Sequence, residues 1–185
     1  MKILLIGIQG AGKSTQGKLL SEKLHLPYLS TGHIFRDIAK EHTPLGRYIK
    51  EVMNSGSLIP DDKTLKIVSE YLHRPEYDKG YIMDGFPRTL HQAEAFENGI
   101  HHAFYLEVSD REALWRLSYR EGEEADGRED ETLKAIRRRI ELFHEHTKPV
   151  LEYYRHHRKL ITVNGEQSIE DIHKEILHKI KIEKE

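Results

Sequence analysis

The feature that most constrains this chain is a glycine-rich motif near its start, Gly7-Ile8-Gln9-Gly10-Ala11-Gly12-Lys13-Ser14, which directly follows the apolar run Ile3-Leu4-Leu5-Ile6. The motif matches the phosphate-binding P-loop pattern G-x-x-x-x-G-K-[ST], in its expected place between a strand and a helix. Its glycines let backbone N–H groups converge on a phosphate, and the helix N-terminus adds a favourable dipole. Lys13 is suited to reach the β- and γ-phosphates, and Ser14 is suited to ligate Mg²⁺. The motif therefore predicts binding of a nucleoside triphosphate.

The composition of the 185-residue chain indicates which partners and which cellular location to expect. The formal net charge is −2, so overall charge gives no support for nucleic-acid binding. The chain has no cysteine, which excludes disulfides and thiolate metal sites and fits a reducing cytoplasm. The apolar run before Gly7 is too short for a secretion signal, and no other run reaches the length of a membrane helix. We therefore expect a cytoplasmic protein with no nucleic-acid or membrane partner.

Short apolar runs alternate with helix-like stretches along the chain. We predict strands at residues 2–7, 27–29, 81–84, 103–108 and 160–163, and helices at residues 12–24, 34–40, 44–55, 61–73, 89–98, 111–120, 131–155 and 168–180. This alternation predicts an α/β protein with the P-loop NTPase fold, a five-stranded parallel sheet flanked by helices. Ligands of such sheets bind at the carboxyl ends of the strands. Residues 30–59 and the polar stretch 121–128 interrupt the alternation and are interpreted as inserts.

A second group of polar residues follows the predicted strand at 81–84. It reads Asp84-Gly85-Phe86-Pro87-Arg88-Thr89-Leu90-His91-Gln92. A carboxylate at a strand end is typical of the residue that holds Mg²⁺ in P-loop enzymes, although Asp84 would also suit a helix or turn cap. Arg88 offers a planar fork that suits a phosphate, and Gly85 permits a close approach of the backbone. The chain thus carries a candidate second phosphate site.

The motifs, taken in order along the chain, closely resemble those of the adenylate kinase family of nucleoside monophosphate kinases: Gly7–Gln16, Ser30-Thr31-Gly32, Arg36, Ser57-Leu58-Ile59-Pro60-Asp61, Asp84–Thr89, then Arg116, Arg120, Arg128 and Arg139, and finally Thr162-Val163-Asn164. The resemblance implies the Mg²⁺-dependent reaction ATP + AMP = 2 ADP, and we expect a monomer. It also implies a CORE of residues 1–29, 60–120 and 129–185, an NMP-binding insert at 30–59 and a short LID at 121–128. Long-lid members often carry a cysteine-based zinc site, so no structural zinc is expected in this short-lid, cysteine-free chain.

The same resemblance assigns a role to each motif. ATP binding falls to Gly10, Ala11, Gly12, Lys13, Ser14, Thr15, Arg116, Arg120 and Gln167, the last through its backbone carbonyl. AMP binding falls to Thr31, Arg36, Ser57, Leu58, Ile59, Gly85, Phe86, Pro87, Arg88, Gln92, Arg128 and Arg139. The expected catalytic residues are Lys13, Arg88, Arg120, Arg128 and Arg139, and the expected Mg²⁺ residues are Ser14 and, through water, Asp84. Arg116 and Arg120 are four residues apart and therefore share a helix face, whereas Arg137 and Arg138 are expected to be solvated.

Three positions depart from the family pattern, which usually has Pro in place of Gln9, Gly in place of Ser14 and Asp in place of His33. An imidazole cannot supply the negative charge of that Asp, so we expect His33 to be a spectator or to position a water molecule.

Two other functions remain open. A UMP- or CMP-type kinase is disfavoured by Thr31 and Gln92. A P-loop NTPase acting as an assembly factor would need no acceptor site and is disfavoured by the set Arg36, Arg88 and Gln92.

Overall fold

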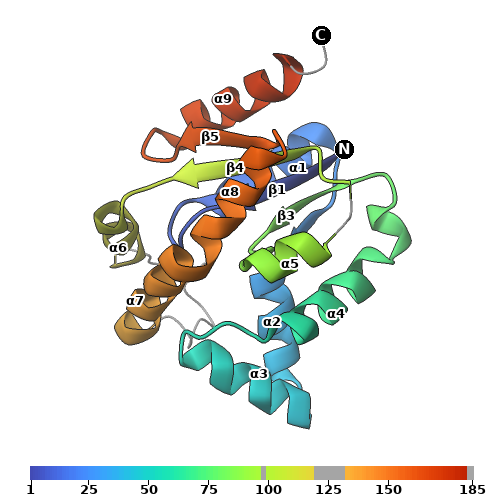
Figure 1. Cartoon of the computed structure of the whole chain (residues 1–185), viewed down its shortest axis with the longest axis vertical. Coiled ribbons are helices and arrows are strands. Elements are labelled where there is room, and N and C mark those ends of the chain that lie inside the picture. Colours follow the sequence, from blue (N-terminus) through green and yellow to red (C-terminus); the bar gives the residue numbers. More distant parts are fainter. Residues whose placement is uncertain (97–98, 119–131, 183–185) are drawn as a thin grey trace.

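The computed structural model describes residues 1–96, 99–118 and 132–182 (Figure 1). Five parallel strands form one sheet in the order β2-β3-β1-β4-β5. They are β1 (Lys2–Ile6), β2 (Tyr28–Ser30), β3 (Tyr81–Asp84), β4 (His102–Glu107) and β5 (Leu160–Asn164). The predicted fold class and the five predicted strands are confirmed, each strand within one residue of its expected bounds.

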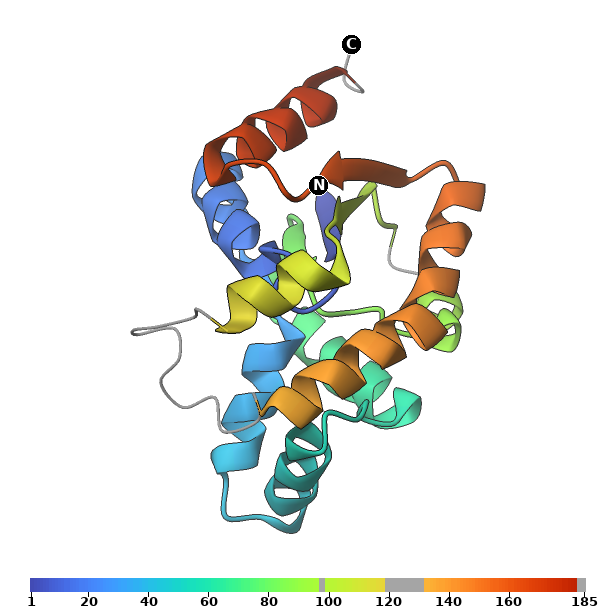
Figure 2. The same cartoon turned by 90° about the vertical axis from the view of Figure 1, so that its left-hand side faces the viewer.

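Helices cover both faces of the sheet. They are α1 (Lys13–Leu24), α2 (Thr31–Lys40), α3 (Pro44–Asn54), α4 (Asp61–Leu72), the 3₁₀ helix η1 (Pro75–Tyr77), α5 (Leu90–Ala95), α6 (Asp110–Ser118), α7 (Leu133–Leu142), the π-helical segment η2 (Phe143–Thr147), α8 (Lys148–His156) and α9 (Ile169–Ile182). Figure 2 shows α1 and α9 on one side of the sheet and α8 on the other, while α2 and α3 project beyond its edge. Among the described residues, no helix combines the length and the apolar character that crossing a membrane requires.

The central strands read as continuous apolar runs because both faces of the sheet are covered there, whereas Thr162 of the edge strand β5 is exposed. Ile3, Leu4 and Leu5 of β1 and Ile82 and Met83 of β3 are at most 1% exposed. Burial of such side chains supplies roughly 1.5–3 kcal/mol each toward folding. The strands that lead into the functional site are therefore the most firmly anchored part of the molecule.

The strand register brings three segments together at one edge of the sheet. Asp84, the last residue of β3, pairs with Leu5 of β1 on one side and with Ser30 of β2 on the other. β1 leads into the P-loop, and β2 leads directly into α2. The carboxyl ends of these three strands therefore present the P-loop, Asp84 and the start of α2 side by side.

Three helix predictions were wrong in their details. The helix predicted at 89–98 begins at Leu90 and ends at Ala95, and Phe96 is not helical. The helix predicted at 131–155 is interrupted by η2, because Pro149 in the first turn of α8 has no N–H to continue the α-helical pattern. Helix α2 begins at Thr31 rather than at residue 34. Its first turn contains Gly32, which has weak helix propensity, but burial of Thr31 and its hydrogen bond to the Asp84 carbonyl override that preference.

Candidate active site

The P-loop is shaped by two glycines in the left-handed region of φ. Gly10 has φ 88° and Gly12 has φ 86°, and α1 begins immediately after Gly12. A Cβ atom on Gly10 would lie 2.9 Å from the backbone oxygen of Ala113, so α6 also excludes a side chain there. The loop therefore turns tightly enough to point N–H groups toward one spot at the N-terminus of α1.

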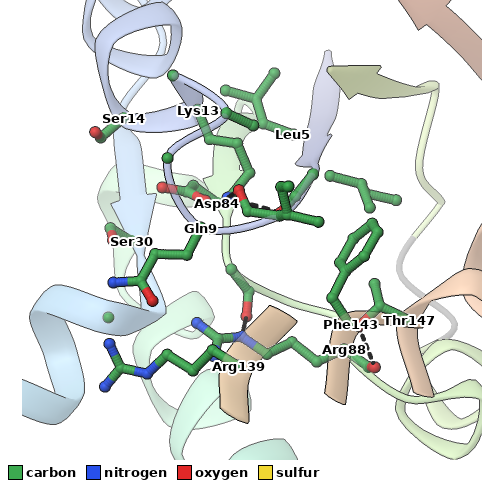
Figure 3. Close-up of a pocket in the computed structure, with 18 of the residues that line it drawn as sticks. Leu5, Gln9, Lys13, Ser14, Ser30, Asp84, Arg88, Arg139, Phe143 and Thr147 are labelled. Atoms are coloured by element: carbon green, nitrogen blue, oxygen red, sulfur yellow. Dashed lines mark hydrogen bonds between the residues drawn. The ribbon is translucent and has the colours of Figure 1, made fainter. Parts of the chain in front are cut away.

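Lys13 and Ser14 occupy the first turn of α1. The Lys13 Nζ atom donates hydrogen bonds to the carbonyl oxygens of Gly7, at 2.7 Å, and Ile8, at 2.8 Å, so its ammonium lies over the rim of its own loop. Figure 3 shows Lys13 and Asp84 on one side of the cavity and Arg88 and Arg139 on the other. All four side chains line this cavity: the positive charges of Lys13, Arg88 and Arg139 suit phosphates, whereas the Asp84 carboxylate suits a cation.

One cavity of 670 Å³ gathers nearly all of the predicted site residues. Those that line it are Gly10, Ala11, Gly12, Lys13, Ser14, Thr15, Arg36, Ser57, Leu58, Ile59, Asp84, Gly85, Phe86, Pro87, Arg88, Gln92, Arg116, Arg139 and Gln167. Thr31 does not line it: this side chain is 1% exposed, and its hydroxyl donates to the backbone oxygen of Asp84 at 3.3 Å. Arg120, Arg128 and the predicted LID at 121–128 lie outside the described residues.

A hydrogen bond from a tyrosine fixes the Asp84 carboxylate. The Tyr28 hydroxyl donates to the Asp84 Oδ2 atom at 2.9 Å, and Asp84 itself is 7% exposed. Burial raises the pKa of Tyr28 well above its usual value, and the neighbouring Asp84 charge raises it further, so the hydroxyl stays a donor. The chain keeps α1 close to this pair with Gly17, where a Cβ atom would lie 2.3 Å from the Tyr28 ring.

Arg88 is oriented by three backbone contacts. Its Nε atom donates to the Gly85 carbonyl oxygen at 2.7 Å, and its backbone N–H donates to the Gln92 Oε1 atom at 2.7 Å. Its carbonyl accepts from the Thr147 hydroxyl at 2.8 Å, a contact provided by η2. Gly85, with φ 82°, permits this turn, and a Cβ atom there would lie 2.6 Å from the Thr31 hydroxyl oxygen. The guanidinium is therefore a preorganised anion ligand at the cavity wall.

Arg139 joins α7 to α3. Its Nη2 atom donates to the carbonyl oxygen of Met53 at 3.0 Å, while its side chain also lines the cavity. Arg137 and Arg138 are exposed, as predicted, and Arg138 forms an ion pair with Glu141 at 3.1 Å. Of these three consecutive arginines, Arg139 alone belongs to the cavity.

The end of the cavity beyond the P-loop is formed by α6 and the turn after β5. Arg116 donates from Nε to Glu112 at 2.8 Å and from Nη2 to the Gly165 carbonyl at 2.9 Å. Gln167 Nε2 donates to Glu175 Oε2 at 2.8 Å. This contact uses the side chain, so the role predicted for the backbone carbonyl of Gln167 stays a prediction. A hydrogen bond from the Ser109 N–H lowers the pKa of Glu166. This end is therefore rich in fixed polar groups.

Several residues of the site were given no individual role by the sequence analysis, among them Gln16, Trp115 and Asp61. Gln16 is 1% exposed, lines the cavity and donates from Nε2 to the Ile169 carbonyl at 2.9 Å, which ties α1 to α9. Trp115 is 57% exposed and lines the cavity beside Arg116. Asp61 contacts Gln92 from outside the cavity. Gln16 and Asp61 both stand in motifs that the sequence analysis quotes, but the contact of Asp61 with Gln92 joins residues 31 positions apart and has no local signal.

Comparison with known proteins places the chain among its relatives. A protein-family model described as adenylate kinase matches residues 5–159. The chain is 38% identical over 184 residues to the adenylate kinase of Cyanothece sp., covering 96% of this chain and 93% of that protein. It is 38% identical over 182 residues to adenylate kinase 1 of Nostoc sp., covering 95% and 96%. It is 35% identical over 213 residues to the adenylate kinase of Thermosipho melanesiensis, covering 98% and 100%.

These matches confirm the resemblance that the motifs indicated. They extend over nearly the whole chain and over nearly the whole of each relative, so they concern the complete kinase domain and not the P-loop alone. The chain belongs to the adenylate kinase family, whose members are phosphotransferases that use Mg²⁺ with ATP.

Proposed function

We propose that this chain catalyses the reversible, Mg²⁺-dependent transfer of a phosphoryl group, ATP + AMP = 2 ADP. The observation that carries the proposal is that one cavity of 670 Å³ is lined both by the P-loop and by a second set of phosphate-binding residues, Arg36, Arg88 and Arg139. A P-loop protein that only hydrolyses a triphosphate needs no second set. The relatives named above carry the name of this activity.

The proposed mechanism relies on positioning and charge. The P-loop amides and Lys13 would hold the ATP phosphates, while Arg36, Arg88 and Arg139 would align the AMP phosphate for in-line attack. The AMP phosphate is already ionised, so the reaction needs no strong general base. Water is a competing nucleophile and must be excluded by closure. We assign that closure to the NMP-binding insert at 30–59 and the LID at 121–128, moving over a CORE of 1–29, 60–120 and 129–185.

Ser14 and Asp84 would hold Mg²⁺. Both side chains line the cavity next to the P-loop and both offer oxygen atoms, which Mg²⁺ prefers. Mg²⁺ is usually bound by one or two protein oxygens together with water and substrate phosphates, so no larger protein cage is needed. The ion would neutralise charge on the phosphates during transfer. A cytoplasmic location fits the cysteine-free composition. A monomeric state is part of the same proposal.

Chromatographic nucleotide analysis tests the reaction. With ATP, AMP and Mg²⁺, two ADP should form for each AMP consumed, and omission of Mg²⁺ should stop the conversion. Release of inorganic phosphate from ATP at the same rate with and without AMP would favour the assembly-factor NTPase. Equal use of CMP or UMP in place of AMP would favour the pyrimidine-type kinase.

His33 should influence how the enzyme uses Mg²⁺. It is the third residue of α2, is exposed and lines the cavity, where the family usually has Asp. Histidine side chains gain positive charge below about pH 6.5, and a positive charge here would repel Mg²⁺. The Mg²⁺ concentration for half-maximal rate should therefore rise more between pH 8 and pH 6 in the wild type than in His33→Asp.

The matched control is His42→Asp, which changes an exposed histidine of the same insert that does not line the cavity. It should leave the Mg²⁺ dependence at both pH values as in the wild type. Loss of activity in His33→Asp at both pH values would contradict the prediction, because it would assign the imidazole a specific role of its own.

A further inference from the structure

A carboxylate outside the cavity controls a side chain inside it. Asp61 is the first residue of α4, and Gln92 lies in α5, the helix that packs beside α4 (Figure 1). The Gln92 Nε2 atom donates to Asp61 Oδ1 at 2.8 Å. Gln92 lines the cavity but is only 2% exposed, whereas Asp61 is not among the lining residues. Asp61 can therefore reach a bound nucleotide only through Gln92.

The orientation of the Gln92 amide follows from the chemistry of its two partners. The backbone N–H of Arg88 can only donate, so the atom it meets at 2.7 Å must be the amide oxygen. The Asp61 carboxylate can only accept, so the atom it meets must be the amide nitrogen. A flipped amide would set donor against donor and acceptor against acceptor. The two contacts therefore admit one orientation.

Asp61 is itself fixed in place. Its second oxygen, Oδ2, accepts a hydrogen bond from the Thr89 hydroxyl at 2.9 Å, and Thr89 in turn caps α5 by accepting from the Gln92 N–H at 3.1 Å. The carboxylate, the cap of α5 and the amide of Gln92 thus form one closed network of hydrogen bonds. Such a network stabilises a single arrangement of its members.

We propose that Asp61 is a positioning residue that locks the Gln92 amide and so makes the acceptor site select a 6-amino purine over a 6-oxo purine. Each end of the amide keeps one further hydrogen-bonding position: a lone pair on Oε1 and an N–H on Nε2. Adenine offers the matching pair, an amino donor and the N1 acceptor. The hypoxanthine base of IMP offers the reverse, an oxygen acceptor and an N1–H donor. This inference rests on the proposed AMP site.

The test compares AMP with IMP, which differ at these positions of the base and share the same ribose phosphate. The quantity measured is the ratio of kcat/KM for AMP to kcat/KM for IMP. Asp61→Ala should lower this ratio about tenfold, because it removes one of the two contacts that oppose a flipped amide and leaves only the Arg88 N–H to hold the amide oxygen. Asp61→Asn, which keeps one acceptor oxygen, should lower the ratio less.

Asp62→Ala is the matched control. Asp62 is the next residue of α4, is exposed, and shares with Asp61 the favourable charge at a helix N-terminus. It should leave the ratio unchanged. Gln92→Ala should remove most of the discrimination, and the double variant Asp61→Ala/Gln92→Ala should have the same ratio as Gln92→Ala alone, since Asp61 acts only through the amide.

The outcomes separate the two proposals. If the wild type does not convert AMP to ADP, the proposed function fails and this inference fails with it. If the wild type uses AMP but Asp61→Ala and Asp61→Asn lower kcat/KM equally for both nucleotides, Asp61 has a structural role only and this inference alone is overturned. Independent effects of Asp61→Ala and Gln92→Ala on the ratio would overturn it as well. Should Asp61→Ala fail to fold, the fall expected for Asp61→Asn decides the question.

Discussion

Replacing Lys13 by Met should lower kcat by roughly 10²–10³-fold, the cost of losing one preorganised charge that faces the transition state, or about 3–4 kcal/mol. Lys13 lies at the start of α1 and lines the cavity, where its ammonium can follow the charge that moves between the phosphates. Its ammonium donates hydrogen bonds to two carbonyls of the loop rim, and we expect the thermal unfolding temperature to change little on their loss. Steady-state kinetics and a thermal unfolding scan measure the two effects.

Lys23→Met is the control, because Lys23 is exposed in the last turn of the same helix. It removes the same charge from α1 at a distance from the cavity and should leave kcat unchanged. A Lys13→Met enzyme that melts normally and keeps more than half of the wild-type kcat would refute the role of Lys13.

Replacing Arg88 by Gln should lower kcat/KM for AMP by about 10²–10³-fold, since a charged donor aimed at a phosphoryl group is typically worth that much. The loss should appear for AMP, with a smaller change in KM for ATP, because Arg88 lies across the cavity from Lys13 (Figure 3). Initial rates measured with each substrate varied in turn separate the two effects.

The matched control is Arg138→Gln. Arg138 is exposed and paired with Glu141, and an exposed pair of this kind contributes little to stability. Its loss should change neither constant. An Arg88→Gln enzyme whose KM rises for ATP but not for AMP would show that Arg88 serves the other nucleotide.

The sequence allowed prediction of those features that depend on neighbouring residues. The apolar runs indicated the strands, most directly β1 and β3, because strands covered on both faces of a sheet are continuously hydrophobic. The P-loop could be located because its glycines, Lys13 and Ser14 follow one another along the chain. Most roles of single residues, such as those of Arg36 and Gln92, came from the family resemblance, and the cavity gathers these residues as the resemblance implied.

The features that were not predicted depend on contacts between distant segments. Asp61 stands at the end of a family motif, but its hydrogen bond to Gln92 becomes visible only when α4 packs beside α5. Thr31 reads as a loop residue before an α-helix, yet its burial against Asp84 starts that helix. The π-helical segment η2 is an exception, because Pro149 gives it a local cause, but the hydrogen bond of Thr147 to Arg88 joins distant segments. Local propensity carries no information on such pairings.

The register of β3 with its neighbours has a kinetic consequence. Because β3 lies between β1 and β2, the P-loop and α2 emerge two strand spacings apart, roughly 10 Å. The backbone hydrogen bonds that pair β3 with β1 and β2 hold this separation, so the distance between the P-loop and the start of α2 is fixed by the sheet. Substitutions in α2 and α3 should then alter how fast substrates enter and products leave, while the reach of the phosphoryl group across the sheet edge stays constant.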